Sequence, residues 1–183
     1  MSSKKFLISF LFLTVFFSAA TYSQGKFKGG LGFNYVSNNY HLEFLESYFA
    51  KSLHLSYAVF QKDRFSLSME TASLLKAKQE DYARTTSFIT SLPVNAQYEF
   101  RKIALHAGAG PAYLNQRVSY SQRTVRMSGA SVHLLIGVAW KGEPIFADVV
   151  YPEFTVRINY FKSFKGYPYD AGMISLVIFL RAV

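Results

Sequence analysis

The chain has 183 residues and a formal net charge of +9, and 50% of its residues are hydrophobic while only 17% are charged. Soluble domains carry about 25% charged residues, so this composition is unusual for a water-soluble domain. There is no cysteine, which excludes disulfides, thiolate metal sites and cysteine nucleophiles. The positive charge is spread along the chain without a zinc-finger, RNP-like or basic-helix pattern, so nucleic acid is not expected as a partner.

The first residues have the pattern of an export signal. Lys4 and Lys5 precede an apolar run at 6–17, and small residues follow that run. The alternative is an uncleaved membrane anchor, which needs ~20 apolar residues, and the run is shorter. Cleavage is expected after Ser23, with Ala20 as the other candidate position. The sequence therefore predicts a signal peptide at 1–23 and an exported domain at 24–183.

Beyond the signal, apolar and polar residues alternate with a period of two, which is the pattern of β-strands. In the first such segment, Phe27, Leu31, Phe33 and Tyr35 share one face. The clearest segment, "FITSLPVNAQYEF", alternates over its whole length and exceeds the roughly 5–6 residues usual for a strand. The pattern predicts about eight strands, at 26–36, 51–60, 64–71, 88–100, 103–114, 130–140, 145–151 and 173–183.

Short turns and long polar connections alternate along the chain. Tight turns are expected at 61–63, 101–102 and 141–144, and long connections follow the first, third, fifth and seventh strands, including 76–86, 115–129 and 152–172. Transmembrane barrels of the up-and-down type have this order, with short turns on the periplasmic side and long loops outside.

The two faces of the strands indicate what surrounds the barrel. A soluble barrel points apolar side chains inward and polar ones outward. Here one face carries mainly Ser, Gly, Ala, Asn and His, while the opposite face is a continuous series of Phe, Leu, Tyr, Val and Ile. Lipid outside fits this pattern better than water, and strands in lipid must close on themselves because an open edge leaves backbone groups unpaired. We therefore expect an all-β fold, a single up-and-down antiparallel transmembrane β-barrel of about eight strands in the outer membrane of a Gram-negative cell.

A proline interrupts the segment at 88–100. Because Pro93 cannot donate to a β-ladder, we expect it on the inward face near the loop end of its strand, at a bulge or at the start of regular pairing. Gly108 and Gly110, next to Pro111, would allow the neighbouring backbone to approach or bend there.

Two of these segments carry a family resemblance. "SLPVNAQYEF", followed by a two-residue turn and "IALHAGAGPAYL", resembles the paired strands of the PorT-like outer-membrane β-barrel family, and "ASVHLLIGVAW" and "IFADVVY" match the next two strands more loosely. The resemblance covers the chain from about Lys26 onward and is sharpest between Leu92 and Tyr113. It implies an outer-membrane barrel of about eight strands, and the family has no common catalytic residues to carry over.

Charged residues on the inward faces are expected to form ion pairs that fill the interior, because an eight-stranded barrel is just wide enough for side chains. A selective pore is the alternative. These residues are Lys28, Arg64, Glu70, Glu99, Arg101 and Asp148. Three of the four histidines, His54, His106 and His133, also fall on inward faces, but no pair of histidines has metal-ligand spacing. We expect no metal, no cofactor and no catalytic residue.

Two further groups of residues are expected to meet the membrane. Basic residues of the long loops could contact anionic lipid or lipopolysaccharide: Arg117, Arg123, Arg126, Arg157, Lys162 and Lys165. Aromatic residues near the strand ends fit interfacial girdles: Tyr35, Tyr57, Tyr98, Phe100, Tyr113, Trp140 and Tyr151.

These features predict a non-enzymatic barrel with a structural or interaction role, whose outward loops bind envelope components or an envelope protein. One alternative is a lipid-modifying enzyme, a lipid A or phospholipid hydrolase or acyltransferase, for example with His133, Ser131 and Glu99. A Ser–His–acid triad is recognised by mutual placement rather than by abundance of these residues. The second alternative is a soluble periplasmic barrel that binds an apolar ligand.

Overall fold

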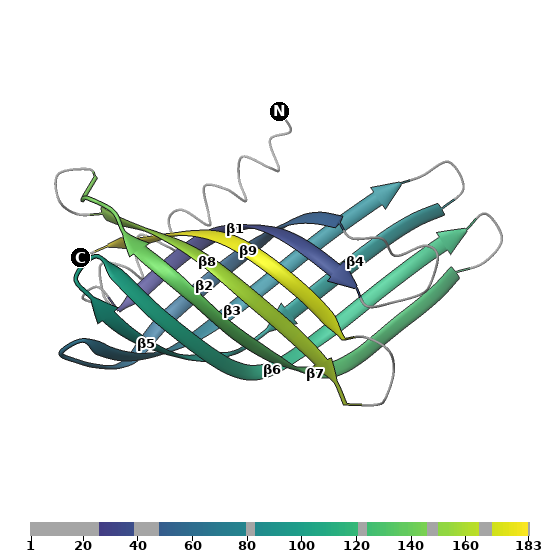
Figure 1. Cartoon of the computed structure of the whole chain (residues 1–183). Coiled ribbons are helices and arrows are strands. Elements are labelled where there is room, and N and C mark those ends of the chain that lie inside the picture. Colours follow the sequence, from purple (N-terminus) through teal and green to yellow (C-terminus); the bar gives the residue numbers. More distant parts are fainter. Residues whose placement is uncertain are drawn as a thin grey trace.

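The computed structural model describes residues 26–38, 48–79, 83–120, 124–145, 150–164 and 170–182 (Figure 1). Its strands are β1 (Phe27–Asn38), β2 (Tyr48–Lys62), β3 (Phe65–Gln79), β4 (Ala83–Ser91), β5 (Val94–Phe100), β6 (Ile103–Tyr120), β7 (Thr124–Lys141), β8 (Val150–Ser163) and β9 (Ala171–Ala182). The expected signal peptide at 1–23 lies outside these ranges. Within the described ranges, no helix has the length and apolarity needed to cross a bilayer.

The strands form one closed antiparallel barrel, as the sequence predicts. The hydrogen-bonded order β2-β1-β9-β8-β7-β6-β4-β3 returns to its start because β3 also pairs with β2. β4 and β5 are two halves of one long strand, since both pair with β3 on one side and with β6 on the other. The nine assigned strands therefore make eight barrel strands, and Figure 1 shows them tilted around a common axis.

The barrel has its apolar face outside and its polar face inside, which confirms the predicted orientation. Phe33, Leu92 and Ile136 are 53%, 45% and 59% exposed, whereas Asn34 and His133, on the inward faces of β1 and β7, are 1% and 2% exposed. A small apolar cluster does lie within the barrel, formed by Val36, Ala50, Leu74, Ile89, Ala112, Phe161, Ala171 and Met173. The polar interior and the apolar exterior are the reverse of a soluble barrel and match a barrel in lipid.

Two of the predicted long loops are mostly strand. β3 continues to Gln79 before β4 begins, and β6 continues to Tyr120 before β7 begins. The expected loops at 76–86 and 115–129 are therefore wrong over most of their length, and Figure 1 shows the two hairpins projecting from one end of the barrel. These extensions carry polar residues on both faces, so the two-residue alternation is lost although the backbone pairing continues.

The seventh predicted strand is also misplaced. We expected a strand at 145–151 and a loop at 152–172, but β8 spans Val150–Ser163. The expectation treated Pro152 as the end of a strand, whereas it lies near the beginning of one, where its carbonyl accepts a hydrogen bond from the Gly142 amide at 2.8 Å. The segment after it alternates fully, with Phe154, Val156, Ile158 and Tyr160 outside and Glu153, Thr155, Arg157 and Asn159 inside.

Pro93 lies in the middle of its strand and produces no bulge, so that part of the prediction is wrong. Ser91 pairs with Ala72 and Val94 pairs with Met69, three steps along each strand, so the register is unchanged across the proline. The Pro93 carbonyl still accepts a hydrogen bond from the Glu70 amide at 2.9 Å. The strand therefore loses one N–H donor and keeps its pairing on both sides. Pro93 does face the interior, as expected, and is fully buried.

The glycine beside this proline allows two backbones to approach closely. A Cβ at Gly110 would lie 2.2 Å from the Leu92 carbonyl oxygen and 2.5 Å from the Pro93 Cα. Both obstacles are backbone atoms of the neighbouring strand, so they cannot move aside as a side chain can. The predicted role of this glycine in a close backbone approach is confirmed.

We predict that Gly110→Ala destabilises the barrel while Gly129→Ala does not. The new methyl group at position 110 forces backbones apart, which should lower the free energy of unfolding by about 1–3 kcal/mol. At Gly129 a Cβ would meet no atom within 4 Å, which makes this glycine a matched control. Urea unfolding of both variants refolded into lipid vesicles measures the difference, and equal stability of the two variants would contradict it.

Candidate functional site

The interior is organised around the carboxylate of Glu70, which β3 places at the centre of the described barrel. Glu70 is 1% exposed. Its Oε1 accepts hydrogen bonds from Arg157 Nη1 at 2.6 Å and pairs with His54 Nδ1 at 2.8 Å, while its Oε2 accepts one from Asn95 Nδ2 at 2.8 Å. The Arg157 guanidinium also lies over the Phe179 ring, 5.0 Å from its centroid. A buried carboxylate is tolerated when it is paired and hydrogen-bonded, and these partners supply both.

A hydrogen-bonded chain leads from Glu70 to a serine. Ser52 Oγ lies 2.6 Å from His54 Nε2, and Asn34 Nδ2 donates to Ser52 Oγ at 2.9 Å. Serine, histidine and carboxylate therefore occur in the order of a hydrolase triad. The predicted example of His133, Ser131 and Glu99 does not form such a chain among the described residues: His133 Nε2 pairs with Asn159 Oδ1 at 3.0 Å, and Glu99 pairs with Lys141.

The surroundings of Ser52 do not suit catalysis. The backbone of Gly32 lies so close that a Cβ there would be 2.3 Å from Ser52 Oγ and 2.8 Å from His54 Nε2. Ser52 and His54 are 6% and 3% exposed, and neither lines the interior cavity described below. An acyl group needs space beside the nucleophile, so this chain serves as a hydrogen-bond network in the structure that we see.

A second network of hydrogen bonds joins polar side chains of the interior nearer the long-loop end. Asn159 Nδ2 donates to Ser175 Oγ at 2.9 Å and to the Met173 carbonyl at 3.3 Å. The His133 ring stacks on Phe161, with centroids 4.4 Å apart. These contacts hold β7, β8 and β9 together across the interior.

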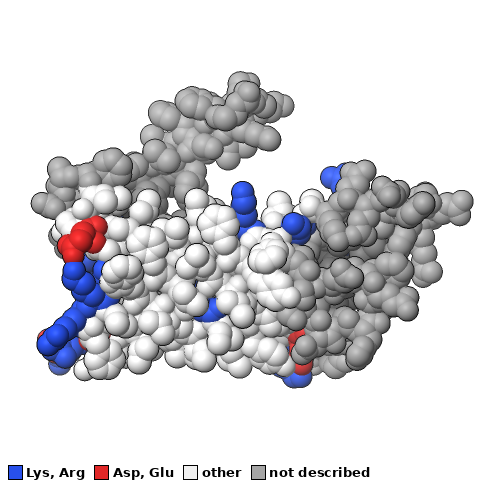
Figure 2. All heavy atoms as spheres, turned by 45° about the horizontal axis from the view of Figure 1, so that its top comes forward, with Lys and Arg blue, Asp and Glu red and all other residues white. Residues whose placement is uncertain are grey.

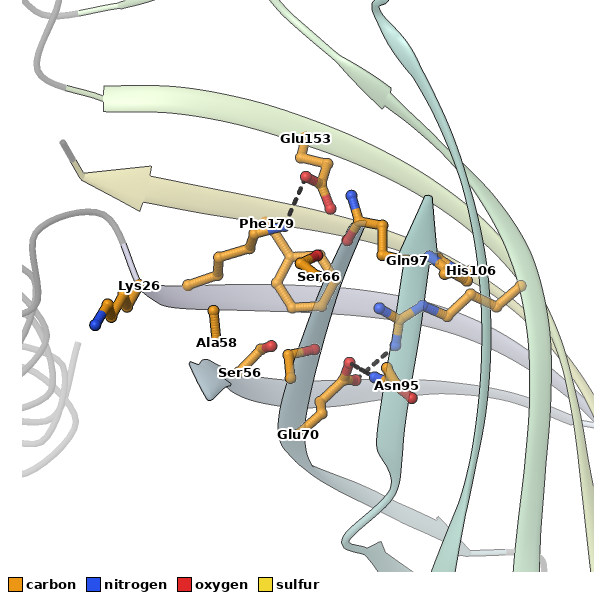
Figure 3. A pocket seen from close by; sticks show the side chains of 13 residues that line it. Lys26, Ser56, Ala58, Ser66, Glu70, Asn95, Gln97, His106, Glu153 and Phe179 are labelled. Carbon is orange, nitrogen blue, oxygen red and sulfur yellow. Dashed lines mark hydrogen bonds and ion pairs between the residues drawn. The ribbon is translucent and has the colours of Figure 1, made fainter. Parts of the chain in front are cut away.

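The interior also holds a cavity near the short-turn end (Figure 3). It has about 30 Å³ of space for the centres of water molecules. Exposed Lys26, half-buried Ser66 and buried Glu70 and Arg157 are among the residues that line it. Lys28 Nζ forms an ion pair with Glu153 Oε2 at 2.7 Å on its wall. The cavity thus runs from the short-turn end toward the Glu70 network.

The predicted interior charges are placed as follows. Lys28 and Glu70 face the interior, and half-buried Glu99 pairs with Lys141 at 2.5 Å. Arg64 and Arg101 are exposed residues of the two tight turns, so their assignment to the interior is wrong; turn residues lie beyond the strands, where alternation no longer defines a face. Asp148 lies outside the described residues.

Sequence reasoning missed Arg157 and Glu153, which belong to the interior network. Arg157 was expected in an outward loop, but β8 buries it to 5% exposure against Glu70. The cause is the misplaced seventh strand. The alternation of polar and apolar residues from Glu153 to Phe161 was the signal that could have found both residues.

The other predicted basic residues lie at or near the loop ends. Arg117 and Lys162 are exposed on β6 and β8. The backbone of Arg126 lies opposite Arg117 in the β6–β7 ladder, while Arg123 and Lys165 lie outside the described residues. Lys162 Nζ pairs with Asp170 at 2.6 Å, and its ammonium lowers the pKa of that carboxyl below its ordinary value.

The predicted girdle residues lie on the outer face near both ends of the strands. Tyr35, Tyr57, Tyr98, Phe100, Tyr113 and Trp140 are exposed and Tyr151 is half-buried. Two ring pairs stand out, Tyr98 with Phe100 at 4.7 Å and Trp140 with Phe154 at 6.2 Å between centroids. Figure 2 shows a face made mostly of uncharged side chains, with charged groups gathered at its left end and a few Lys or Arg groups elsewhere on it. Within the described residues, no group of three or more His, Asp or Glu could hold a metal ion.

Comparison with solved structures supports the outer-membrane fold. The chain is similar to Ail, the attachment invasion locus protein of Yersinia pestis (TM-score 0.64, 10% identity, covering 85% of this chain and 95% of Ail). It is also similar to Neisserial surface protein A (TM-score 0.55, 12% identity, covering 85% of this chain and 94% of that protein). A third similar structure is the N-terminal barrel domain of Pseudomonas aeruginosa OprF (TM-score 0.50, 12% identity, covering 84% of this chain and 96% of that domain).

A second structure of Ail was solved in complex with the heparin analogue sucrose octasulfate (0.58, 12%, 85% and 95%). No protein-family model matches the chain, and no curated protein matches it. A closed eight-stranded barrel with a polar interior and an apolar belt is the architecture of outer-membrane proteins, so the chain is an outer-membrane β-barrel.

We predict that Glu70 and Arg157 stabilise the barrel as a coupled pair. Either Arg157→Met or Glu70→Gln leaves an uncompensated partner in the interior and should lower the free energy of unfolding by about 3–5 kcal/mol. The loss in free energy of unfolding of the double variant should be smaller than the sum of the losses of the two single variants, by at least about 2 kcal/mol. Urea unfolding of all four proteins in lipid vesicles completes the cycle, and additive losses would show that the two charges do not interact.

We also predict that Ser52 does not react as a nucleophile. A fluorophosphonate probe applied to the folded protein in detergent should label it no more than it labels Ser52→Ala, because no space is open beside Ser52 Oγ. Mass spectrometry of the labelled peptide provides the measurement. Labelling near one probe per chain that disappears in Ser52→Ala would restore the enzyme alternative.

Proposed function

We propose that this protein is a non-enzymatic, PorT-like outer-membrane barrel whose outward-facing cationic strand ends bind the anionic headgroups of lipopolysaccharide. The barrel acts as the anchor, and the hairpins above the apolar belt act as the interaction surface. The observation that carries the proposal is a pair of arginines on neighbouring strands, Arg84 on β4 and Arg117 on β6, at the long-loop end.

The two arginines are close neighbours on the sheet. Arg84 pairs with Ser119, and Thr86 pairs with Arg117, so the arginines occupy a diagonal position across the ladder, where long side chains meet. Both are exposed, and both continue the outward alternation of Leu92 and Tyr113. They therefore lie on the outer surface, just beyond the level of the aromatic girdle.

The chemistry of this surface suits a phosphorylated glycolipid. The long-loop end of a bacterial barrel faces outward, where the lipid headgroups are phosphorylated sugars. Arginine presents a planar fork of donors that matches phosphate oxygens in two parallel hydrogen bonds. The complex of Ail with a sulfated heparin analogue shows a barrel of this fold beside a polyanionic sugar, which supports the proposal by analogy. A protein partner in the envelope, reached through the long loops, would add to this role.

We predict that Arg84→Gln/Arg117→Gln weakens binding of lipopolysaccharide. Each charge-assisted contact contributes about 1.5–3 kcal/mol, so loss of both should lower the affinity at least tenfold. The control is Arg64→Gln/Arg101→Gln, which removes the same charge from the short-turn end. Titration of purified lipopolysaccharide into the refolded barrel in detergent, followed by fluorescence, measures both. An equal loss in the two double variants would mean that net charge alone governs binding, and no loss in either would refute the proposed surface.

A further inference from the structure

The barrel wall is closed within the apolar belt, but β7 continues beyond the belt with a free edge. Ala130 lies opposite Tyr113 of the aromatic girdle, so residues 124–129 extend past the girdle at the long-loop end (Figure 1). This whole segment pairs with β6. The pairing of β7 with β8 ends at Ser131, apart from one hydrogen bond from the Phe164 amide to the Ala130 carbonyl at 3.4 Å. Among the described strands, 124–129 therefore has a neighbour on one side only.

The backbone groups that point to the open side can be identified from the other end of the strand. The Lys141 amide donates to the Lys102 carbonyl next to β6, whereas the following amide, of Gly142, donates to the Pro152 carbonyl of β8. Successive residues of an antiparallel strand alternate in this way, and the β6–β7 register has no shift. Odd-numbered residues of β7 therefore turn their N–H and C=O toward β6. The residues that turn these groups to the open side, where no described strand receives them, are Thr124, Arg126 and Ser128.

The connection between β8 and β9 is too short to supply the missing strand. Only residues 165–169 separate Phe164 from Asp170, and Asp170 Oδ1 accepts a hydrogen bond from the Ser163 amide at 3.3 Å. The connection therefore begins and ends at the level of Ser163. Because an extended chain spans at most about 3.6 Å per residue, this length cannot run the whole way beside 124–129 and return.

An edge of this kind is suited to pairing with an extended segment of another protein. Natural proteins usually block exposed edges with proline, a bulge or charged side chains. The segment 124–129 contains no proline, its one charged residue is Arg126, and its register with β6 shows no bulge. Thr124 and Ser128 are exposed. A strand added here would pair with the main chain of β7 directly, which is a recurring mode of peptide recognition.

The charge beside the edge favours an acidic segment. Arg117 is exposed, and its backbone lies opposite that of Arg126 in the ladder. The two described arms of this hairpin, 112–120 and 124–130, contain no acidic residue. Opposite charges on neighbouring strands stabilise their pairing and like charges destabilise it. Acidic residues are therefore favoured in an added strand and basic residues are disfavoured.

A second copy of the chain in the same membrane does not fit the edge. Both copies would stand with the same end outward, so a rotation about the membrane normal would relate them. Barrel strands are tilted by about 35–45°, and this rotation would make the two β7 edges cross at about 70–90°. Hydrogen-bonded neighbours are rotated by only about 20–25° relative to each other. The edge therefore needs a segment that is free to align with it.

We propose that the β7 edge at 124–129 binds an extended acidic segment of another protein outside the cell by adding it to the sheet as a strand. The main chain of this segment pairs with Thr124, Arg126 and Ser128. The inference does not rest on lipopolysaccharide binding, because the edge consists of main-chain groups of β7 whereas the proposed lipopolysaccharide surface consists of the side chains of Arg84 and Arg117.

The test is amide hydrogen exchange, followed by NMR, of the full barrel in nanodiscs with and without an acetylated, amidated seven-residue peptide of alternating Glu and Val. Without peptide, exchange should be fast at Thr124, Arg126 and Ser128 and slow at Met127 and Gly129, whose amides point to β6. Saturating peptide should slow exchange at the first three amides at least tenfold and leave the other two unchanged. Absence of a saturable effect at the first three would overturn the proposal.

Two variants at one position separate main-chain pairing from charge. Ser128→Pro removes one N–H from the open edge and leaves the bonds to β6 in place, because proline is tolerated where its nitrogen faces a free edge. It should weaken peptide binding at least tenfold, whereas Ser128→Ala keeps the N–H and should bind as the unchanged protein does. Equal binding by Ser128→Pro would mean that charge alone holds the peptide, which contradicts strand addition.

A modified peptide provides the same comparison without altering the barrel. N-methyl groups on two adjacent central residues block both edges of the peptide, so this peptide should bind the unchanged protein at least tenfold more weakly. It decides the question if Ser128→Pro does not fold, which migration of the unboiled variant on a gel detects. Undiminished binding of the methylated peptide would overturn the proposal.

Three further results identify the occupant. A peptide of alternating Lys and Val should bind at least tenfold more weakly than the Glu peptide, and equal binding would overturn the assignment to an acidic segment. Slow exchange at the same amides without peptide, increasing with protein concentration, would assign the edge to a second copy instead. Ser128→Pro should bind lipopolysaccharide as the unchanged protein does, so failure of the edge and failure of the lipopolysaccharide surface are observed separately.

Discussion

The structure depends on one constraint, that every backbone N–H and C=O within hydrocarbon needs a partner inside the protein. Closure of β3 onto β2 removes the last free sheet edge within the apolar belt, and each strand then has a neighbour on both sides. Pro93 shows how narrow the tolerance is. The strand lacks one N–H donor at its middle, but its register with β6 is the same on both sides of the proline. The adjacent backbone can stay close because position 110 is a glycine, which has no side chain.

Closure in turn determines the interior. Eight strands leave a space that side chains fill, and the outward face is reserved for apolar groups, so polar residues must satisfy one another within the barrel. The convergence of His54, Asn95 and Arg157 on Glu70 is the result. The Ser–His–Glu order arises from the same requirement: Ser52 is the next group available to the second nitrogen of His54. An apparent triad in such an interior is weak evidence for hydrolysis, because catalysis also needs space for a substrate.

The sequence was sufficient to predict the barrel, its orientation and most strands, because lipid imposes the two-residue alternation directly on residues such as Leu92 and Asn95. The sequence was not sufficient for the parts of the strands that extend beyond the lipid, where this alternation is no longer required. The extensions of β3 to β4 and of β6 to β7 lie beyond the apolar belt, so their residues read as loop although their backbones pair. The partnership of Arg157 with Glu70 spans 87 positions and depends on strand order around the barrel. No local sequence pattern could have predicted this pairing.

The distribution of charge links the interior to the two ends. In the described interior, the charge of Glu70 is matched by Arg157 and that of Glu153 by Lys28, because an unmatched charge in a low-dielectric space is costly. The chain's net charge of +9 must therefore be carried mainly by residues outside this part of the interior, such as Arg84 and Arg117 at one end and Arg64 and Arg101 at the other. The described barrel thus pairs the charges at its centre and carries unpaired arginines near both ends of its strands, because only there can a charged side chain reach water.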